Sequence, residues 1–165
     1  MLETERLVLR KFRRDDFEAV HSYVGCADNL IFMQFGPNSE EETRAFIEMA
    51  ISSPVHHFAV TLKDVVIGGC TLHYEDGTGE MGWLLHRDYW KQGLGTEIAR
   101  ALLSFGFDEL NAHRITARCD LENIGSSKLM EKVGMRREGL FLDARPPNKL
   151  SKKAIWRRAA LRHLA

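Results

Sequence analysis

The residues of this chain best suited to chemistry form the stretch Trp90-Lys91-Gln92-Gly93-Leu94-Gly95-Thr96-Glu97. It follows an apolar run and opens a segment whose apolar residues recur at helical spacing. Two glycines one residue apart let the backbone come close to a bulky anion. The free N–H groups and the dipole of a first helical turn favour negative charge at that place. We therefore expect this turn to bind a pyrophosphate.

The turn does not match either of the two common phosphate-binding motifs. A dinucleotide fingerprint needs a third glycine at the position of Ile98. A P-loop needs Gly-Lys-Ser/Thr after four spacer residues, which this stretch lacks. By itself, the turn fits an ordinary strand-to-helix connection as well as it fits an anion site.

A second polar segment, Asp120-Leu121-Glu122-Asn123-Ile124-Gly125-Ser126-Ser127, directly follows the predicted strand 114–119. A helix connects the predicted strand 79–85 to this one, so the two strands should be parallel neighbours. Ligands of such sheets lie beyond the C-terminal ends of adjacent parallel strands. The glycine turn and this segment should therefore face each other across one site.

The apolar periodicity along the chain predicts an α+β fold with a mixed sheet in a single domain, 1–165. Ser39 and Glu42 are expected to form a capping box, and Gly68-Gly69 a bulge or a close backbone approach. Residues 26–38 and Pro146-Pro147-Asn148 are predicted loops. The predicted strands are 4–10, 57–62, 65–74, 79–85, 114–119, 135–142 and 154–161, and the predicted helices are 13–24, 39–53, 93–110 and 123–132.

The composition is typical of a soluble globular protein, with 44% hydrophobic and 28% charged residues. No apolar run approaches the roughly 20 residues that span a membrane, and the acidic N-terminus does not resemble a secretory signal. Cys26, Cys70 and Cys119 lack disulfide or metal spacing, which fits a cytoplasmic protein. His56 and His57 are adjacent and point to opposite faces of a strand, so we expect no metal.

The chain after Asp143 carries only basic charges. This pattern suits a solvated terminal strand and its loop, or a patch for an acidic partner such as RNA or a CoA phosphate. Because Trp156 alone does not make the interleaved pattern of aromatic side chains that stacks bases, nucleic acid is not the expected partner.

Together these motifs resemble the GNAT acetyltransferase superfamily, in particular its RimJ/RimL-like branch, over nearly the whole chain. The motifs are Thr4-Glu5-Arg6-Leu7-x-Leu9-Arg10, Glu80-Met81-Gly82-Trp83, Tyr89-Trp90-Lys91-Gln92-Gly93-Leu94-Gly95-Thr96-Glu97, His113-Arg114-Ile115-Thr116-Ala117, Asn123-x-x-Ser126 and Glu131-Lys132-Val133-Gly134-Met135-Arg136-Arg137-Glu138-Gly139.

The resemblance implies the GNAT fold: a central mixed, mostly antiparallel sheet, splayed into a V between strands 79–85 and 114–119 and flanked by about four helices. It also implies that acetyl-CoA is the cosubstrate and lies in the V. The backbone of Leu84, Leu85 and His86 would pair with the pantetheine arm like an added strand. The N–H groups of Gln92, Gly93, Leu94, Gly95 and Thr96 would hold the pyrophosphate, and Asn123 and Ser126 would face the pantetheine and the thioester.

The sequence departs from the family pattern at three places. Trp90 stands where many members have Gln or Arg, as is usual in the RimJ/RimL-like branch. Met130 stands where many members have a tyrosine acid. The predicted last strand, Trp156-Arg157-Arg158-Ala159-Ala160-Leu161-Arg162, is basic where the family often carries acidic residues and tyrosine.

The implied reaction is direct attack of a primary amine on the thioester in a ternary complex. Glu80 is the candidate base and Ser126 the candidate acid toward the leaving thiolate. Alternatively, Glu80 faces solvent and Ser126 is only a hydroxyl in a first helical turn. A backbone N–H near Leu85 could stabilise the oxyanion, although proximity alone supplies much of the rate.

The acceptor is a protein N-terminal α-amine or a small-molecule amine. We expect its pocket between the C-terminal hairpin and the 25–38 loop, with Phe32, Met33 and Phe35. A non-catalytic acetyl-CoA-binding sensor or interaction module fits the same motifs. Glu97 is expected to interact with the helix dipole. Exposed strand edges leave both a monomer and a homodimer open.

Overall fold

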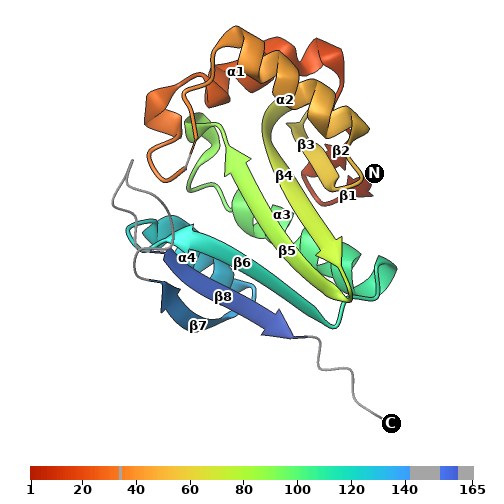
Figure 1. Cartoon of the computed structure of the whole chain (residues 1–165), viewed down its shortest axis with the longest axis vertical. Helices are drawn as coiled ribbons and strands as arrows, with labels where there is room; N and C mark the ends of the chain where they lie inside the picture. Colours follow the sequence, from red (N-terminus) through yellow and green to blue (C-terminus); the bar gives the residue numbers. More distant parts are fainter. Residues whose placement is uncertain (34, 142–152, 160–165) are drawn as a thin grey trace.

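The computed structural model describes residues 1–33, 35–141 and 153–159, whose strands form one sheet in the order β1-β2-β3-β4-β5-β6-β8-β7 (Figure 1). The strands are β1 (Leu2–Glu3), β2 (Leu7–Arg10), β3 (His56–Leu62), β4 (Val65–Glu75), β5 (Thr78–Leu85), β6 (Arg114–Asp120), β7 (Arg136–Phe141) and β8 (Lys153–Ala159). The helices are α1 (Phe17–Val24), α2 (Glu40–Ser52), α3 (Leu94–Ser104) and α4 (Ile124–Lys132), with 3₁₀ turns η1 (Arg14–Asp16), η2 (Ala27–Asn29) and η3 (Arg87–Tyr89) and the π-helical turn η4 (Phe105–Glu109).

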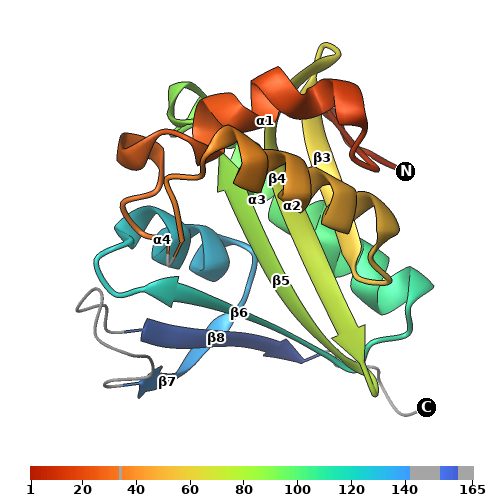
Figure 2. The ribbon, with the colours of Figure 1, turned by 45° about the horizontal axis from the view of Figure 1, so that its top comes forward.

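Two helices cover each face of the sheet (Figures 1 and 2). One buried cluster lies under α1 and α2 and includes Val20 and Ile47. The other lies under α3 and α4, where Ile98 and Leu102, one helical turn apart, are fully buried. Burying a side chain of this size contributes roughly 1.5–3 kcal/mol to folding. The sheet is therefore fixed between two apolar layers.

The sheet opens between β5 and β6, its one parallel pair among the described strands. Pairing is restricted to Thr78, Gly79 and Glu80 of β5 with the first three residues of β6. The two strands begin side by side and diverge toward their C-terminal ends (Figure 2). This is the mixed, mostly antiparallel sheet with a V at the predicted place.

The predicted strand 4–10 is wrong at its start. A turn at residues 4–6 separates β1 from β2. Thr4 causes it: its backbone N–H donates to the carbonyl of Leu7 at 2.9 Å, and its Oγ1 accepts from the Leu7 N–H at 2.9 Å. A side chain that bonds nearby backbone in this way competes with the ladder of a strand.

The predicted helix 13–24 begins as the 3₁₀ turn η1, and the α-helix starts at Phe17. Asp16 explains the change, because its buried carboxylate accepts from the Arg10 guanidinium at 2.6 and 2.8 Å and from the Arg13 N–H at 2.8 Å.

The predicted capping box at the start of α2 is confirmed. Ser39 Oγ accepts from the Glu42 N–H at 3.2 Å, and Glu42 Oε2 accepts from the Ser39 N–H at 2.7 Å.

The close approach predicted at Gly68 is also confirmed. A Cβ on Gly68 would lie 2.3 Å from the carbonyl oxygen of Leu84. The register of β3 and β4 shifts between Val60 and Thr61, opposite this stretch.

Some predictions concern parts of the chain outside the described residues. These are Leu142, the predicted loop 146–148, the end of the last predicted strand and the side chains of the basic C-terminal segment. None of the helices described is long and apolar enough to cross a membrane.

Candidate functional site

The V between β5 and β6 contains a cavity of about 240 Å³. Strands β5 and β6, the start of α4 and the segment after η2 all contribute to its wall. Its lining is Phe32, Met33, Phe35, Met81, Gly82, Trp83, Arg118, Cys119, Asp120, Asn123 and Ser126. The predicted polar segment therefore meets the predicted aromatic loop here. Glu80 is not part of this lining, but its partner Arg118 is.

The backbone of β5 has a definite orientation at the V. The N–H of His86 donates to the carbonyl of Ile67, the residue before Gly68, at 2.8 Å. In an antiparallel ladder alternate residues present their N–H and C=O groups to the same side. Leu84, two residues before His86, therefore also directs its backbone groups toward β4.

This orientation corrects the prediction that Leu84, Leu85 and His86 together pair with a pantetheine arm. His86 has both backbone groups occupied, because its carbonyl also accepts from the Tyr89 N–H at 2.9 Å. By the same alternation, the residues whose backbone groups face the V are Met81, Trp83 and Leu85. Of the three predicted residues, only Leu85 therefore directs its backbone groups toward the V.

The carbonyl of Leu85 closes the far end of this edge. It accepts from Asn29 Nδ2 at 3.2 Å and from Trp90 Nε1 at 2.8 Å. Asn29 is buried, and its Oδ1 also accepts from the Arg87 N–H at 2.6 Å. Sequence reasoning missed this clamp of Asn29, since a single asparagine in a loop carries no pattern.

The glycine turn leads into α3 through two left-handed residues. Lys91 and Gly93 have positive φ angles of 60° and 80°, and α3 begins at Leu94. The first backbone bond of the helix runs from the Glu97 N–H to the Gly93 carbonyl at 3.2 Å. The N–H groups of Leu94 to Thr96 therefore precede any helical acceptor.

The two glycines of the turn have different roles. Gly93 is needed for its left-handed conformation, which other residues adopt at a cost. Gly95 faces α4: a Cβ there would lie 2.7 Å from Cδ1 of Leu129, so that side chain would have to shift. Of the two glycines, only Gly93 is therefore required by the backbone conformation of the turn.

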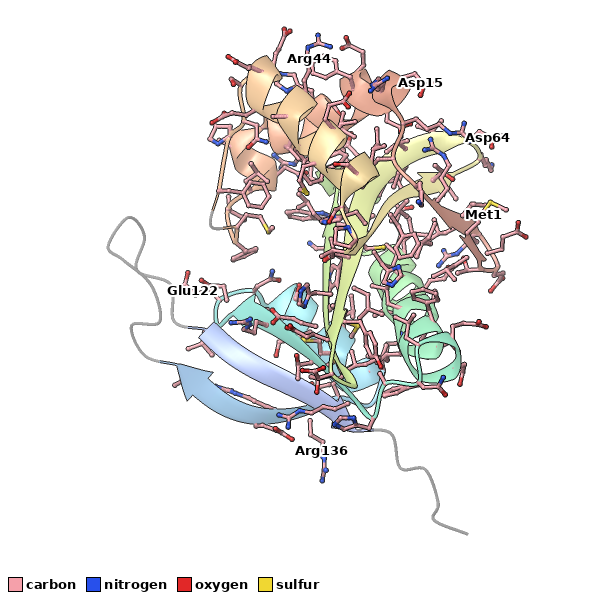
Figure 3. All side chains as sticks on the ribbon, turned by 45° about the vertical axis from the view of Figure 1, so that its right-hand side comes forward. Met1, Asp15, Arg44, Asp64, Glu122 and Arg136 are labelled. Carbon is pink, nitrogen blue, oxygen red and sulfur yellow. The ribbon has the colours of Figure 1, made fainter. Side chains whose placement is uncertain are left out.

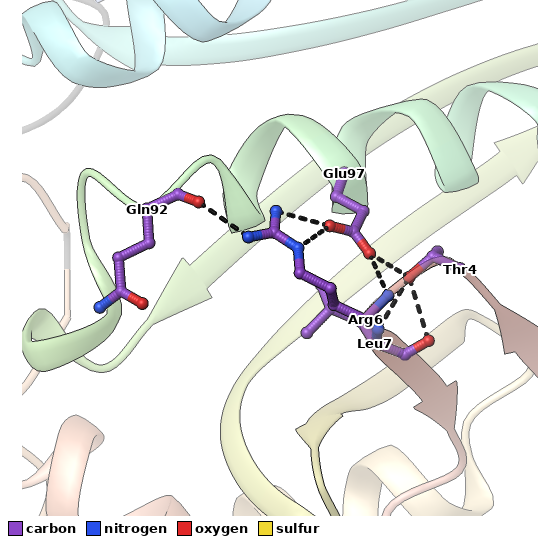
Figure 4. A network of polar contacts seen from close by, with 5 residues as sticks. All are labelled: Thr4, Arg6, Leu7, Gln92 and Glu97. Atoms are coloured by element: carbon purple, nitrogen blue, oxygen red, sulfur yellow. Dashed lines mark hydrogen bonds and ion pairs between the residues drawn. The ribbon is translucent and has the colours of Figure 1, made fainter.

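Glu97 connects this turn to the N-terminal segment (Figure 4). Its carboxylate accepts from Thr4 Oγ1 at 2.5 Å, from the Arg6 N–H at 2.8 Å and from Arg6 Nε at 2.8 Å. Burial raises the pKa of Glu97, but these hydrogen bonds and the Arg6 charge outweigh burial and lower the pKa overall. A neighbouring hollow of about 470 Å³ is lined by these residues together with Gly93 and Thr96.

Glu80 lies at the point where the strands part. Its Oε1 accepts from Arg118 Nε at 2.8 Å, and its Oε2 contacts Arg118 Nη2. The hydrogen bond to Glu80 raises the pKa of Arg118. The candidate base is therefore an ion-paired carboxylate, and it does not simply face solvent.

Asp120 is a second carboxylate at the site, which sequence reasoning did not single out. It is buried and lines the cavity, and its Oδ1 accepts from the Glu122 N–H at 2.9 Å. Figure 3 places Glu122 just beyond the C-terminal end of β6. Ala117 and Cys119 belong to the core under α3 and α4. Strand alternation then puts Arg118 and Asp120 on the opposite face, and counting residues along β6 could have found this pair.

Asn123 and Ser126 both line the cavity at the start of α4. Asn123 is the N-cap, and its Oδ1 accepts from the Ser126 N–H at 3.0 Å. The cap thus uses the amide oxygen of Asn123 and leaves its NH₂ group for a ligand. Ser126 lies in the first turn, as expected, but its hydroxyl is not the cap.

Across residues 1–33, 35–141 and 153–159, no three His, Cys, Asp or Glu side chains are grouped to hold a metal.

Comparison with known proteins identifies relatives along most of the chain. Residues 6–136 match the family model described as "Acetyltransferase (GNAT) domain". "Uncharacterized N-acetyltransferase YnaD" of Bacillus subtilis (strain 168) is 36% identical over 144 residues, 85% of this chain and 85% of that protein. "Uncharacterized N-acetyltransferase p20" of Bacillus licheniformis is 32% identical over 152 residues, 86% of this chain and 85% of that protein.

Solved structures share the fold. An acetyltransferase (GNAT family) from Bacillus anthracis has a TM-score of 0.89 at 36% identity, covering 96% of this chain and 97% of its own. Two more distant structures have TM-scores of 0.82. One is a RimL ribosomal L7/L12 alpha-N-protein acetyltransferase in complex with coenzyme A, at 15% identity, covering 94% and 95% of the two chains. The other is a spermidine N-acetyltransferase from Vibrio cholerae in complex with CoA and spermine, at 20% identity, covering 93% and 95%.

Proposed function

Since this chain belongs to the GNAT acetyltransferase family and is an acetyltransferase, we propose that it transfers the acetyl group of acetyl-CoA to a primary amine, by direct attack in a ternary complex. The observation that carries this proposal is the open edge of β5, which faces Asn123 and Ser126 across the V. An extended ligand arm can add to such an edge as a strand would.

The residues present fit acetyl-CoA. The backbone N–H and C=O groups of Met81 and Trp83 would serve the amides of the pantetheine arm. Leu85 offers only its N–H, since its carbonyl already accepts from Asn29 and Trp90. The N–H groups of Leu94 to Thr96 offer donors to a pyrophosphate. The RimL and spermidine acetyltransferase structures named above both contain coenzyme A, which is consistent with this assignment. When bound, acetyl-CoA supplies the thioester carbonyl carbon that the amine attacks.

The residues around the V would divide the proton transfers between them. The attacking amine must lose a proton as its bond to carbon forms, and Glu80 would take it directly or through water. Asp120 would attract the ammonium form of the acceptor into the cavity. The C–S bond then breaks, and the Ser126 hydroxyl would donate a proton to the leaving thiolate. The Leu85 N–H would stabilise charge on the carbonyl oxygen.

The ion pair of Glu80 and Arg118 favours an acceptor that needs little help in losing its proton. An α-amine has a pKa of about 7.7–8.0, whereas a lysine-type amine has a pKa of about 10.4. Of the two acceptor classes considered, a protein or peptide N-terminus therefore suits this site better than a polyamine. Phe32, Met33 and Phe35 would contact its first side chains. This preference is consistent with membership of the RimJ/RimL-like branch, which the motifs also support.

Calorimetry and a thiol-release assay on the full chain test the proposal. Isothermal titration should give saturable binding of acetyl-CoA. Free CoA should then appear only with an amine, and faster with short peptides bearing free N-termini than with polyamines. Binding without release across a broad panel would favour an interaction module, and absence of acetyl-CoA binding would reject the proposal.

A further inference from the structure

We propose that Arg6 is a positioning residue of the cofactor site: it neutralises Glu97 and anchors the carbonyl of Gln92, so that the first turn of α3 can accept a pyrophosphate. The inference rests on the proposed function, in which that turn holds the pyrophosphate of acetyl-CoA. It assigns a role in cofactor binding to a residue 86 positions from Gln92 in the chain.

Glu97 presents an electrostatic problem for any anion at this turn. It lies in the first turn of α3, directly after Thr96. A carboxylate there interacts favourably with the helix dipole but also competes with an anionic ligand for it. Its side chain is only 14% exposed, so water and salt screen its charge poorly.

Arg6 removes this problem by direct contact. Its Nε donates to Glu97 Oε2 at 2.8 Å, and its Nη2 lies 2.7 Å from the same oxygen. The other oxygen, Oε1, accepts from the Arg6 N–H and from Thr4 Oγ1. Both carboxylate oxygens are thus engaged by the N-terminal segment, which offsets their charge.

The same guanidinium also holds the turn itself. Its Nη1 donates to the Gln92 carbonyl at 3.1 Å, and Gln92 stands between the two left-handed residues Lys91 and Gly93 (Figure 4). A Cβ built on Gly93 would lie 3.6 Å from Arg6 Nη2, so the guanidinium lies beside the turn. One side chain therefore fixes the turn's shape and adds positive charge next to it.

The test compares two acetyl donors, one with and one without a pyrophosphate. We would measure CoA affinity by calorimetry, and acetyl transfer from acetyl-CoA and from S-acetylpantetheine, for the full wild-type chain, Arg6→Gln and Arg6→Gln/Glu97→Gln. Arg6→Gln should weaken CoA binding about tenfold or more, because it leaves Glu97 uncompensated. The KM for S-acetylpantetheine should stay nearly unchanged. The second substitution, Glu97→Gln, should restore most of the CoA affinity, because it removes the negative charge that Arg6 no longer offsets.

Two further variants make the result specific. Arg14→Gln also breaks a bidentate arginine–carboxylate pair, with Glu48, but between η1 and α2, away from the site. It should leave CoA affinity at the wild-type value. Arg6→Lys keeps the charge but not the fork of donors, so its CoA affinity should fall between those of wild type and Arg6→Gln. It also serves if Arg6→Gln does not fold.

The outcomes separate this inference from the proposed function. If the wild type binds CoA and the Arg6 variants bind it equally well, the positioning role is rejected while the function stands. Equal losses with both donors, or no recovery in the double variant, would mean that Arg6 only supports the fold and would also reject the role. If the wild type does not bind CoA, the proposed function fails first and the inference with it.

Discussion

The carboxylate of Glu80 on β5 and the guanidinium of Arg118 on β6 form an ion pair across the point where the two strands part. Glu80 is opposite Thr116, at the last residue pair joined by the parallel ladder, and Arg118 lies two residues further along β6. The pair therefore bridges the two strands at the closed end of the V. Each oxygen of Glu80 keeps a lone pair that Arg118 does not use, so Glu80 could still accept a proton in the role proposed for it.

Glu80→Gln should lower kcat about 100-fold, the usual contribution of a general base. The KM for acetyl-CoA should not change, since Glu80 is outside the predicted cofactor contacts. Steady-state kinetics with a peptide acceptor measures both. Glu48→Gln is the matched control, because it removes a carboxylate that also accepts two hydrogen bonds from an arginine, Arg14, elsewhere on the surface. An unchanged kcat in Glu80→Gln would exclude this residue as the base.

Gly93→Asp should abolish measurable CoA binding, whereas Gly93→Asn should weaken it less. Both side chains have the same shape and both tolerate the left-handed conformation, with φ of 80°, better than most residues. They differ in the negative charge that Asp places beside the pyrophosphate, which we expect to cost at least about tenfold more in affinity. Calorimetry on the two variants measures the difference. Equal affinities would show that no anion binds near Gly93.

Asn123→Ser should separate helix capping from cofactor binding. Serine caps a helix about as well as asparagine does, so the melting temperature should be kept. The amide NH₂ is lost, and the KM for acetyl-CoA should rise severalfold. Asn123→Ala loses both functions and should in addition destabilise the fold by about 1 kcal/mol. Thermal unfolding and kinetics on the pair test this assignment; a KM that rises only in the alanine variant would contradict it.

His57 should make the fold sensitive to mild acid. Burial lowers its pKa below the ordinary value, and its Nδ1 is buried without a hydrogen-bond partner among the described residues. Below about pH 6.5, His57 binds a proton in the unfolded chain but remains neutral in the folded chain until a lower pH. The free energy of unfolding should therefore fall as pH falls. His57→Gln should flatten this fall between pH 7 and 5.

Urea unfolding at several pH values measures the effect of His57. The control is His73→Gln, which removes a histidine from an exposed position on β4 and should leave the slope as in the wild type. If the His57→Gln and wild-type curves are parallel, the half-buried His57 ring does not contribute to the pH dependence.

Local chemistry explains why much of the fold was predictable. The capping box of Ser39 and Glu42 depends on residues only three positions apart in the chain, and it forms as expected. The parallel pairing of β5 and β6 follows from the helical connection between them, because such a crossover returns the chain in the same direction and consecutive strands usually lie side by side. Both signals are contained within one element or one connection.

Contacts between distant segments were not predictable in this way. Arg6 and Glu97 are 91 residues apart in the chain, and Glu80 and Arg118 are 38 residues apart. No local sequence pattern predicts contacts over such separations. The edge of β5 failed for another reason. A strand reverses the direction of its backbone groups at every residue, so Leu84, Leu85 and His86 cannot all direct their backbone groups into the V, and His86 bonds to Ile67 instead.

Because β5 keeps an unpaired edge, the stability of the fold should depend on the concentration of a ligand that binds there. β5 is paired with β4 along its whole length but with β6 only at its first three residues. A ligand that hydrogen-bonds to the remaining edge binds the native chain and not the denatured one. By mass action it raises the unfolding free energy by about 2.7 kcal/mol at a hundred times its Kd. This is a sizeable part of the roughly 5–15 kcal/mol that holds most domains together, so heat and proteases would act fastest on molecules that are short of cosubstrate.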